Sequence, residues 1–401
     1  MSVEAFALVG GMVFDGNAFH EGPVSVVVRG GVIDEIGSTA PDGVRVVDLG
    51  EDACLLPGLI DTHVHLVFDA GVDPVKSVCE ASEPELLESM RRAARRAVHA
   101  GVTTIRDLGD RDYLSLGLRD ELAQDVVAGP EILPAGPPIT TPGGHCFFLG
   151  GETAPDAESL ISAVRERHSR GCSVIKVMAS GGNMTPGSLP TEPQFGRELL
   201  KVVVDEAHRL GLPVAAHAHG VRSIDDAIAA GVDSIEHASF VGEQGSDPQQ
   251  GLMEAMAARD VAVSATLGFD PVALAAMLEV MSPGQREQLE AVRAAQDAAL
   301  QGLFKHGVKV SVGSDAGIAP LKPHDVLPHG LVEMARHGWS PGEVLTAATR
   351  DAAKLCGVEG RKGELVTGAD ADFLVVRGNP VADLERLLDV RAVLRMGHRV
   401  R

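Results

Sequence analysis

The chain has 401 residues, a formal net charge of -21 and 45% hydrophobic residues. This length suits one large domain or two unequal ones, and the composition excludes global disorder and a collagen-like protein. The acidic charge argues against nucleic acid or an anionic membrane as a partner, because phosphates are bound by a surplus of Lys and Arg. Five scattered cysteines without a CxxC pair suit a reducing compartment, so we expect a cytoplasmic protein.

Targeting and membrane signals are weak throughout the chain. The first residues, MSVEAFALVGGMVFDG, carry Glu4 and lack a basic region, which is unlike a signal peptide. No uncharged apolar run approaches the ~20 residues needed to cross a bilayer. We therefore expect no membrane partner.

The two ends of the chain carry the same kind of pattern. Short Val-rich runs broken by Gly occupy residues 5–50 and 365–401, and such runs are typical of strands and turns. Neither end is large enough for a sheet with its own core. We therefore expect residues 1–57 and 361–401 to pack together as one composite β-sandwich domain.

Between the two ends, over residues 58–360, strand and helix patterns alternate. Helical patterns cover Pro84–Ala100, Asp156–Arg170, Arg197–Leu210 and Pro283–His306. Eight apolar runs predict strands: Leu59–Val64, Val102–Asp107, Glu131–Ala135, Ser173–Met178, Pro213–His217, Asp233–His237, Val261–Thr266 and Val308–Gly313. Eight such alternations predict an α/β fold, a (β/α)8 TIM barrel that carries the active site. The Gly- and Pro-rich run 184–194 after the fourth strand is typical of a mobile lid or substrate loop.

Histidines and one aspartate gather at the C-terminal ends of four predicted strands. In a barrel these ends face the mouth of the active site, and an HxH pair on a strand places both rings on one side. Imidazoles and carboxylates are the ligands that Zn²⁺ or a similar divalent ion takes. The sequence therefore predicts a metal site at the mouth, made from some or all of His63, His65, His217, His219, His237 and Asp315.

Lys176 lies toward the mouth end of the fourth predicted strand. A bare ammonium there would be costly to bury and would repel a metal ion. Three interpretations follow from its position alone. A neutral Lys176 can add CO₂ and become a carbamate whose two oxygens bridge two ions. Alternatively, the ammonium pairs with Asp315 or binds a carboxylate of the substrate.

Five segments together resemble one enzyme superfamily. They are GLIDTHVH, VIKVMASGG, AAHAHG, SIEHAS and GSDAG, and they resemble the amidohydrolase superfamily. Within it the chain is similar to the imidazolonepropionase-related branch, which contains zinc-dependent prolidases and Xaa-Arg/Lys dipeptidases. The resemblance continues through SPGEVLTAATRDAAKLCG and GELVTGADADFLVV. It implies hydrolysis of the amide or peptide bond of a small-molecule substrate, a dipeptide or an N-acyl amino acid.

The resemblance also implies two divalent metal ions, with zinc as the expected metal. His63 and His65 would hold the first ion together with Asp315. His217 and His237 would hold the second, and a carbamate on Lys176 would bridge the pair. A hydroxide between the ions would attack the carbonyl, and the catalytic Asp315 would pass its proton to the leaving amine.

Three further residues are candidates for binding the substrate. The resemblance suggests this role for His219 and His145, with structural support of the metal ligands or loop packing as the alternatives. Arg106, on the second predicted strand, would bind a carboxylate of the substrate, or else pair with Asp107 or Asp110. The aromatic pocket candidates are Phe147, Phe148, Phe195 and Phe240.

Other functions remain open on the sequence. A lactone, cyclic-amide or organophosphate ester hydrolase uses the same two-metal site. A mononuclear deaminase would not need Lys176. A non-catalytic barrel scaffold tends to lose metal ligands, whereas every matched ligand position of this chain carries a suitable residue. Whether the chain forms a homo-oligomer is also open.

Overall fold

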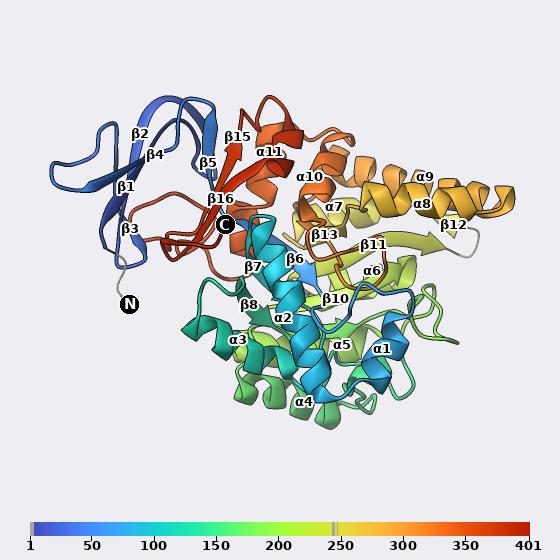
Figure 1. The fold of residues 1–401 in the computed structure, drawn as a ribbon. Coiled ribbons are helices and arrows are strands. Elements are labelled where there is room, and N and C mark those ends of the chain that lie inside the picture. The colour runs from blue at the N-terminus through green and yellow to red at the C-terminus, as the bar shows by residue number, and fades with distance from the viewer. Residues whose placement is uncertain (1–3, 243–244, 247) are drawn as a thin grey trace.

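The computed structural model describes residues 4–242, 245–246 and 248–401. The structure has two parts, a barrel of alternating strands and helices and a sheet domain at one side of it (Figure 1). The blue N-terminal strands and the red C-terminal strands lie side by side in this sheet domain. Within the described ranges, we find no helix with the length and apolarity that crossing a membrane requires.

The barrel contains all eight predicted strands. They pair in parallel within two groups, and bridges from Val64 to Ala316 and from Ile139 to Val177 link the groups. A (β/α)8 barrel is therefore confirmed. Its strands are β6 (Leu59–Val64), β7 (Val102–Asp107), β8 (Glu131–Pro134), β9 (Ile175–Met178), β10 (Val214–Gly220), β11 (Ser234–Gly242), β13 (Ala262–Thr266) and β14 (Val310–Gly313), with the short β12 (Gly245–Ser246) beside β11.

Helices surround the barrel, and sequence signals explain their ends. In α2 (Glu83–His99) the side chains of Ser82 and Glu85 form a capping box, and the helix stops before Gly101, whose φ is +93°. The other helices are α1 (Pro74–Glu80), α3 (Leu114–Gln124), α4 (Ala157–Arg170), α5 (Arg197–Arg209), α6 (Val221–Ala230), α7 (Gln250–Ala258), α8 (Pro271–Val280), α9 (Pro283–Lys305), α10 (Leu327–Ala335), α11 (Pro341–Ala347) and α12 (Arg350–Leu355), with 3₁₀ turns at Phe147–Leu149 and Leu384–Leu388.

The sheet domain joins both ends of the chain, as the Val-rich runs predict. Its strands are hydrogen-bonded in the order β17-β16-β15-β5-β1-β2-β3, with β4 beside β1. A core that includes Phe6, Val28 and Phe373 packs inside it. The strands are β1 (Phe6–Phe14), β2 (Phe19–Arg29), β3 (Val32–Gly37), β4 (Arg45–Asp48), β5 (Ala53–Pro57), β15 (Phe373–Arg377), β16 (Val390–Arg395) and β17 (His398–Arg399).

A buried cluster of charges ties this domain to the barrel. The Lys362 Nζ atom lies 3.0 Å from Glu131 of β8, 2.8 Å from Asp370 and 2.5 Å from Asp372. Arg361 also pairs with Glu131 at 2.5 Å. Burial alone would lower the pKa of Lys362, but the charges of the three carboxylates raise it.

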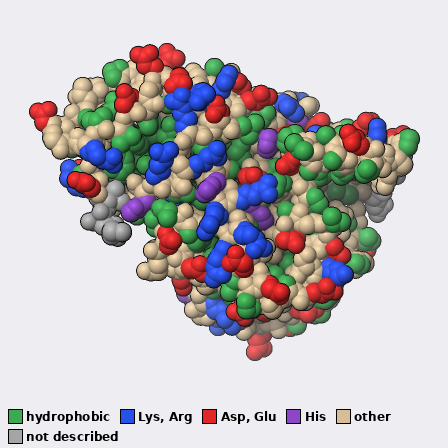
Figure 2. Space-filling model, viewed as in Figure 1, with side chains coloured by type: hydrophobic (Ala, Val, Ile, Leu, Met, Phe, Trp, Pro, Cys, Tyr) green, Lys and Arg blue, Asp and Glu red, His purple; other side chains and the backbone are tan. Residues whose placement is uncertain are grey.

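The helices α8 and α9 form an arm that projects from the barrel (Figure 1). Asp270 caps α8 by accepting hydrogen bonds from Val272 and Ala273, and no residue of α8 is fully buried. Apolar side chains lie along this arm on the face shown in Figure 2, and Val272 and Val280 are 77% and 84% exposed. Helix α8 therefore lacks the buried stripe of the barrel helices, whereas α9 buries Ala299, Leu300 and Leu303 near its C-terminal end.

Candidate metal centre

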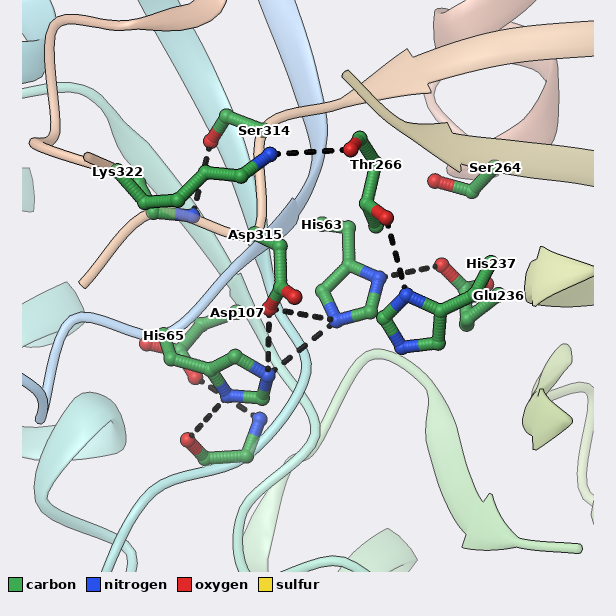
Figure 3. A network of polar contacts seen from close by, with 12 residues as sticks. His63, His65, Asp107, Glu236, His237, Ser264, Thr266, Ser314, Asp315 and Lys322 are labelled. Atoms are coloured by element: carbon green, nitrogen blue, oxygen red, sulfur yellow. Dashed lines mark hydrogen bonds and ion pairs between the residues drawn. The ribbon is translucent and has the colours of Figure 1, made fainter. Parts of the chain in front are cut away.

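The first cluster of ligand atoms lies where β6 and β14 end. His63 and His65 come from β6 and Asp315 follows β14, and their ligand atoms lie within 4.8 Å of one another. The two Nε2 atoms are 3.2 Å apart, and Asp315 Oδ1 is 3.5 Å from each of them. Figure 3 shows the three side chains pointing at one place. One small cation fits among two imidazole nitrogens and a carboxylate oxygen.

A second cluster lies beside the first. His217 and His219 on β10 and His237 on β11 also have ligand atoms within 4.8 Å of one another. The His63 and His237 rings are 5.1 Å apart, so the clusters adjoin. Sequence reasoning treats His219 as a substrate contact and not a ligand. Its ring stacks on that of His237 at 4.5 Å, and it belongs to the same group of three.

In each of the five histidines one ring nitrogen has an oxygen partner, and in His219 this is Nδ1, which lies 2.9 Å from Ser239 Oγ. Such a partner orients a metal-binding imidazole and directs the other nitrogen to the ion. This feature supports metal binding independently of the sequence pattern. The other four contacts are His63 Nδ1 with Glu236 Oε2 at 2.9 Å, His65 Nδ1 with the Gly109 carbonyl at 3.0 Å, His237 Nδ1 with Thr266 Oγ1 at 3.0 Å and His217 Nε2 with the Gly181 carbonyl at 3.2 Å.

Burial keeps these imidazoles neutral. It lowers the pKa of His65 to about 4 and that of His219 to about 3. Burial, followed by neighbouring positive charges, holds the pKa values of His63, His217 and His237 well below the ordinary value. Neutral imidazole is the form that binds a metal, so burial favours the metal-binding form of these rings at neutral pH.

Lys176 lies among the two clusters on β9. Its charge contributes to the lowered pKa values of His63 and His65 in the first cluster and His217 in the second. The side chain is buried, and its Nζ atom has no hydrogen-bond partner within the described parts of the chain. Burial lowers the pKa of Lys176 to about 8, although Glu236 and Asp315 oppose the shift. The ion pair with Asp315 that was one interpretation is not formed among the described residues, because no contact within 4 Å joins the two.

Unusual backbone geometry turns the ligands inward at two strand ends. His237 has a φ of +72° and Asp315 a φ of +54°, a region that is uncommon for residues other than Gly. Such strain is often concentrated at functional sites. In β11 it lets the neighbours Glu236 and His237 both contact the site. A regular strand would point them to opposite faces.

Glycines allow close approaches around the two clusters. A Cβ atom on Gly313 would lie 2.4 Å from the Cβ of His63, so β14 reaches β6 only without a side chain. A Cβ on Gly182 would lie 2.4 Å from His145 Nε2. The His145 ring is 4.7 Å from the ring of His217, which brings this predicted substrate residue to the second cluster.

The Gly- and Pro-rich run 184–194 packs near the end of β10. Thr185 Oγ1 accepts a hydrogen bond from the backbone of Cys146, next to His145. A Cβ on Gly220 would lie 2.8 Å from the Pro190 carbonyl. The run therefore lies beside the candidate substrate residues, and its mobility stays a prediction.

The structure corrects the interpretation of Arg106. We expected a substrate ligand or an ion pair with Asp107 or Asp110, but Arg106 is 1% exposed and its guanidinium contacts Glu236 at 3.0 Å and the Thr62 carbonyl at 2.7 Å. Because these contacts are inside the barrel, Arg106 has no free donor at the mouth. Two of the aromatic candidates, Phe195 and Phe240, are likewise buried in the core.

Sequence reasoning missed three residues around the clusters. Glu236 contacts His63, and Asp61 accepts hydrogen bonds from the backbone of His63 at 3.2 Å and of Ser314 at 2.9 Å. Lys322 donates to the Thr266 carbonyl at 3.0 Å (Figure 3). Asp61 and Glu236 lie one or two positions from predicted ligands, and this proximity in sequence could have identified them. Lys322 lies in a loop after the last strand, and no sequence pattern points to it.

The barrel, the added sheet domain and the histidine-rich mouth define the architecture of an amidohydrolase. The model of the amidohydrolase family matches residues 54–400, and the chain belongs to this family.

Comparison with individual proteins agrees with this family assignment. Ochratoxinase of Aspergillus niger is 31% identical over 371 residues, which cover 84% of this chain and 73% of the relative. Imidazolonepropionase of Pseudomonas putida is 25% identical over 94% of both chains. A crystal structure of a Xaa-Pro dipeptidase with bound methionine superposes with a TM-score of 0.84 and 27% identity over 99% of both chains. The chain is a hydrolase that acts on amide bonds.

Proposed function

We propose that this chain is a binuclear metal-dependent amidohydrolase that cleaves the amide bond of a dipeptide or an N-acyl amino acid. The observation that carries the proposal is Lys176, a buried amine without a hydrogen-bond partner in the described chain, beside two groups of potential ligands. Similarity to a Xaa-Pro dipeptidase supports the substrate class.

In this proposal the two clusters hold one ion each. His63, His65 and Asp315 bind the first ion, and His217 and His237 bind the second. Imidazole and carboxylate donors suit zinc, the metal that we propose. We assign His219 to the substrate, because it lies two residues beyond His217 along β10 and is less buried.

The bridging ligand in this proposal is a carbamate on Lys176. A pKa of about 8 leaves a neutral fraction of the amine at physiological pH, and only the neutral amine forms a bond to CO₂. The neutral amine gains a carboxylate group and releases one proton. Counted from the ammonium form, two protons leave, so an unpaired cation becomes an anion with two oxygen donors. This exchange removes the cost of burying an unpaired ammonium.

The residues of the chain then divide the work of hydrolysis. When bound, the ions would supply Lewis-acid chemistry, which lowers the pKa of a bound water to about 7 and polarises the scissile carbonyl. Asp315 accepts a proton from that water and delivers it to the leaving amine. His145 and His219 contact the substrate beside the second cluster. The five cysteines are unpaired, which suits the cytoplasmic location that we also propose.

The test is a panel of L-dipeptides and N-acyl amino acids, assayed with Zn²⁺ and bicarbonate alongside metal analysis. We expect hydrolysis of at least one group in the panel and two ions per chain. Fewer than one ion per chain in carefully prepared protein would sink the binuclear proposal. Two ions without hydrolysis of any panel member would instead move the substrate class to lactones, cyclic amides or organophosphate esters.

A further inference from the structure

Arg106 and Glu236 form a buried ion pair beneath the first cluster. Arg106 comes from β7 and Glu236 from β11, and the two are 1% and 0% exposed. Arg106 Nη2 donates to Glu236 Oε1 at 3.0 Å, and Arg106 Nε donates to the Thr62 carbonyl, next to His63. Burying two charges is expensive unless their contacts are well made. A pair in this place therefore calls for an explanation beyond stability.

The two oxygens of Glu236 have different partners. Oε1 accepts hydrogen bonds from Arg106 and, at 2.6 Å, from the Ser234 hydroxyl. Oε2 lies 2.9 Å from His63 Nδ1 as an ion-pair contact, and neither atom has a hydrogen bond within the described residues. The carboxylate is thus held by one oxygen and presents the other to His63 (Figure 3).

His63 differs from the other histidines of the two clusters because its partner is a carboxylate, that of Glu236. The outer nitrogens of His65, His217 and His237 contact a backbone carbonyl or a hydroxyl. Among the described contacts of these histidines, only His63 has a carboxylate at its outer nitrogen. A carboxylate partner fixes the proton on Nδ1, directs Nε2 to the ion and strengthens the imidazole as a donor.

We propose that the Arg106–Glu236 pair is a positioning device for His63, which makes the first metal site depend on a buried charge pair that the second site lacks. Arg106 and Ser234 orient Glu236, and Glu236 orients the His63 ring. Both residues act through His63 and touch neither substrate nor ion. The inference rests on the proposed function, because it needs a metal at the first cluster.

The first variant is Glu236→Gln, which keeps the size of the side chain and removes its charge. Competition with a chromophoric chelator, with Co²⁺ and Zn²⁺ as probes, measures the affinity for each ion separately from activity. We expect one of the two ions to bind about 10- to 100-fold more weakly, as for other partners of metal-binding histidines. The second ion should keep its wild-type affinity.

A matched control addresses the second cluster. Thr266→Val removes the neutral hydroxyl partner of His237 and leaves the pair intact. It should weaken the other ion, so the Co²⁺ absorption bands that the two variants lose should differ. If both variants weakened the same ion, or if Glu236→Gln bound both ions as tightly as wild type, the proposal would be overturned.

A double variant keeps the test decisive if Glu236→Gln does not fold, since it leaves Arg106 as an unpaired buried cation. Arg106→Met combined with Glu236→Gln removes both charges, a change that proteins often tolerate. The folded double variant should show the same weakening of one ion. Tight binding of both ions by it would overturn the inference. Wild-type protein that binds fewer than one ion per chain would instead refute the proposed function.

Discussion

Two lysines of this protein are buried in different regions and in opposite electrostatic surroundings. Lys362 lies between the barrel and the sheet domain, where its Nζ atom is within 3.0 Å of three carboxylates. Lys176 lies at the mouth of the barrel, and its Nζ atom has no hydrogen-bond partner in the part of the chain described. The acids raise the pKa of Lys362, while burial lowers the pKa of Lys176 to about 8.

The difference separates a structural lysine from a chemical one. At Lys362 the neighbouring carboxylates compensate the cost of burying the ammonium, so this lysine needs no further partner or modification. At Lys176 no carboxylate lies within 4 Å in the described chain, and the charges of Glu236 and Asp315 only partly oppose the effect of burial on its pKa. The charge of Lys176 instead acts on histidines of both clusters. An amine kept neutral beside two ligand clusters suits carbamate formation, and this contrast can be tested from both sides.

The largest expected effect is that of Lys176→Ala. Without the bridging ligand both ions bind more weakly, and we expect activity to fall at least about 10⁴-fold, the upper end of the contribution of a single proton-transfer group. Short carboxylic acids such as propionate should partly restore metal content and activity. Metal analysis and kcat measurements with and without propionate check this. Full activity of the variant without any additive would contradict a bridging role.

The next effect concerns Asp315, one of the two acids whose charge acts on Lys176. Asp315→Asn should lower kcat by about 10²–10⁴-fold, since it removes the group that accepts the proton. If Asp315 instead served Lys176 as the carboxylates serve Lys362, the loss would appear in stability. Near-native turnover combined with a lower Tm would support that second view.

The complementary variant is Lys362→Met. It leaves the buried Asp372 without its cation, while Glu131 and Asp370 keep their ion pairs with Arg361. Breaking a buried ion pair costs about 3–5 kcal/mol. We expect a lower Tm and a lower urea midpoint, with metal content and kcat of the folded protein unchanged. Lys354→Met, on the exposed side of α12, is the control and should change neither quantity. Loss of metal in Lys362→Met would show that the two regions are coupled.

A smaller effect is expected from pH at the same junction. Burial opposes ionisation of Glu131, but hydrogen bonds from Arg361 and the charge of Lys362 lower its pKa from 4.5 to about 2. A carboxyl group whose pKa is lower in the folded state stabilises that state fully above pH 4.5 and loses this contribution as the pH falls toward 2. The Tm of metal-free protein should therefore decline over this window.

Glu131→Gln tests the assignment of that pH dependence. The variant is less stable at neutral pH, but its Tm should depend less steeply on pH between 4.5 and 2 than that of the wild type. Equal slopes for both proteins would assign the acid sensitivity to other carboxylates.

The fold could be predicted because the periodicity of apolar residues reveals the strands. The ligand positions could be predicted because the ligands stand at the ends of those strands. Eight apolar runs and the residues at their C-terminal ends are enough to bring His63, His65 and Asp315 together in any barrel. Side-chain alternation also predicts which face of a strand a residue occupies, as long as the strand is regular.

The partners of these residues could not be predicted, because they depend on irregular backbone and on contacts between distant strands. In a regular strand Glu236 and His237 would point to opposite faces, and the positive φ of His237 lets both reach the site. Arg106 has acids next to it in sequence, yet its partner is 130 residues away. Of the three carboxylates around Lys362, only Glu131 is distant in sequence in the same way, since Asp370 and Asp372 follow Lys362 within ten residues.

The smallest effect that we predict extends the comparison to the substrate side of the mouth. A side chain at Gly182 would meet His145 Nε2 at 2.4 Å, so Gly182→Ala should displace the imidazole without touching Lys176 or its ligands. Misplacement of a contacting group by about 1 Å can cost up to 10²-fold, and we expect a loss on the order of tenfold in kcat/KM. Gly196→Ala is the matched control, because its Cβ would meet nothing within 4 Å and its φ of -77° suits any residue. Metal content should stay at the wild-type level in both variants. Unchanged kcat/KM in Gly182→Ala would assign His145 to loop packing, and lost metal would extend the chemical region around Lys176 to this loop.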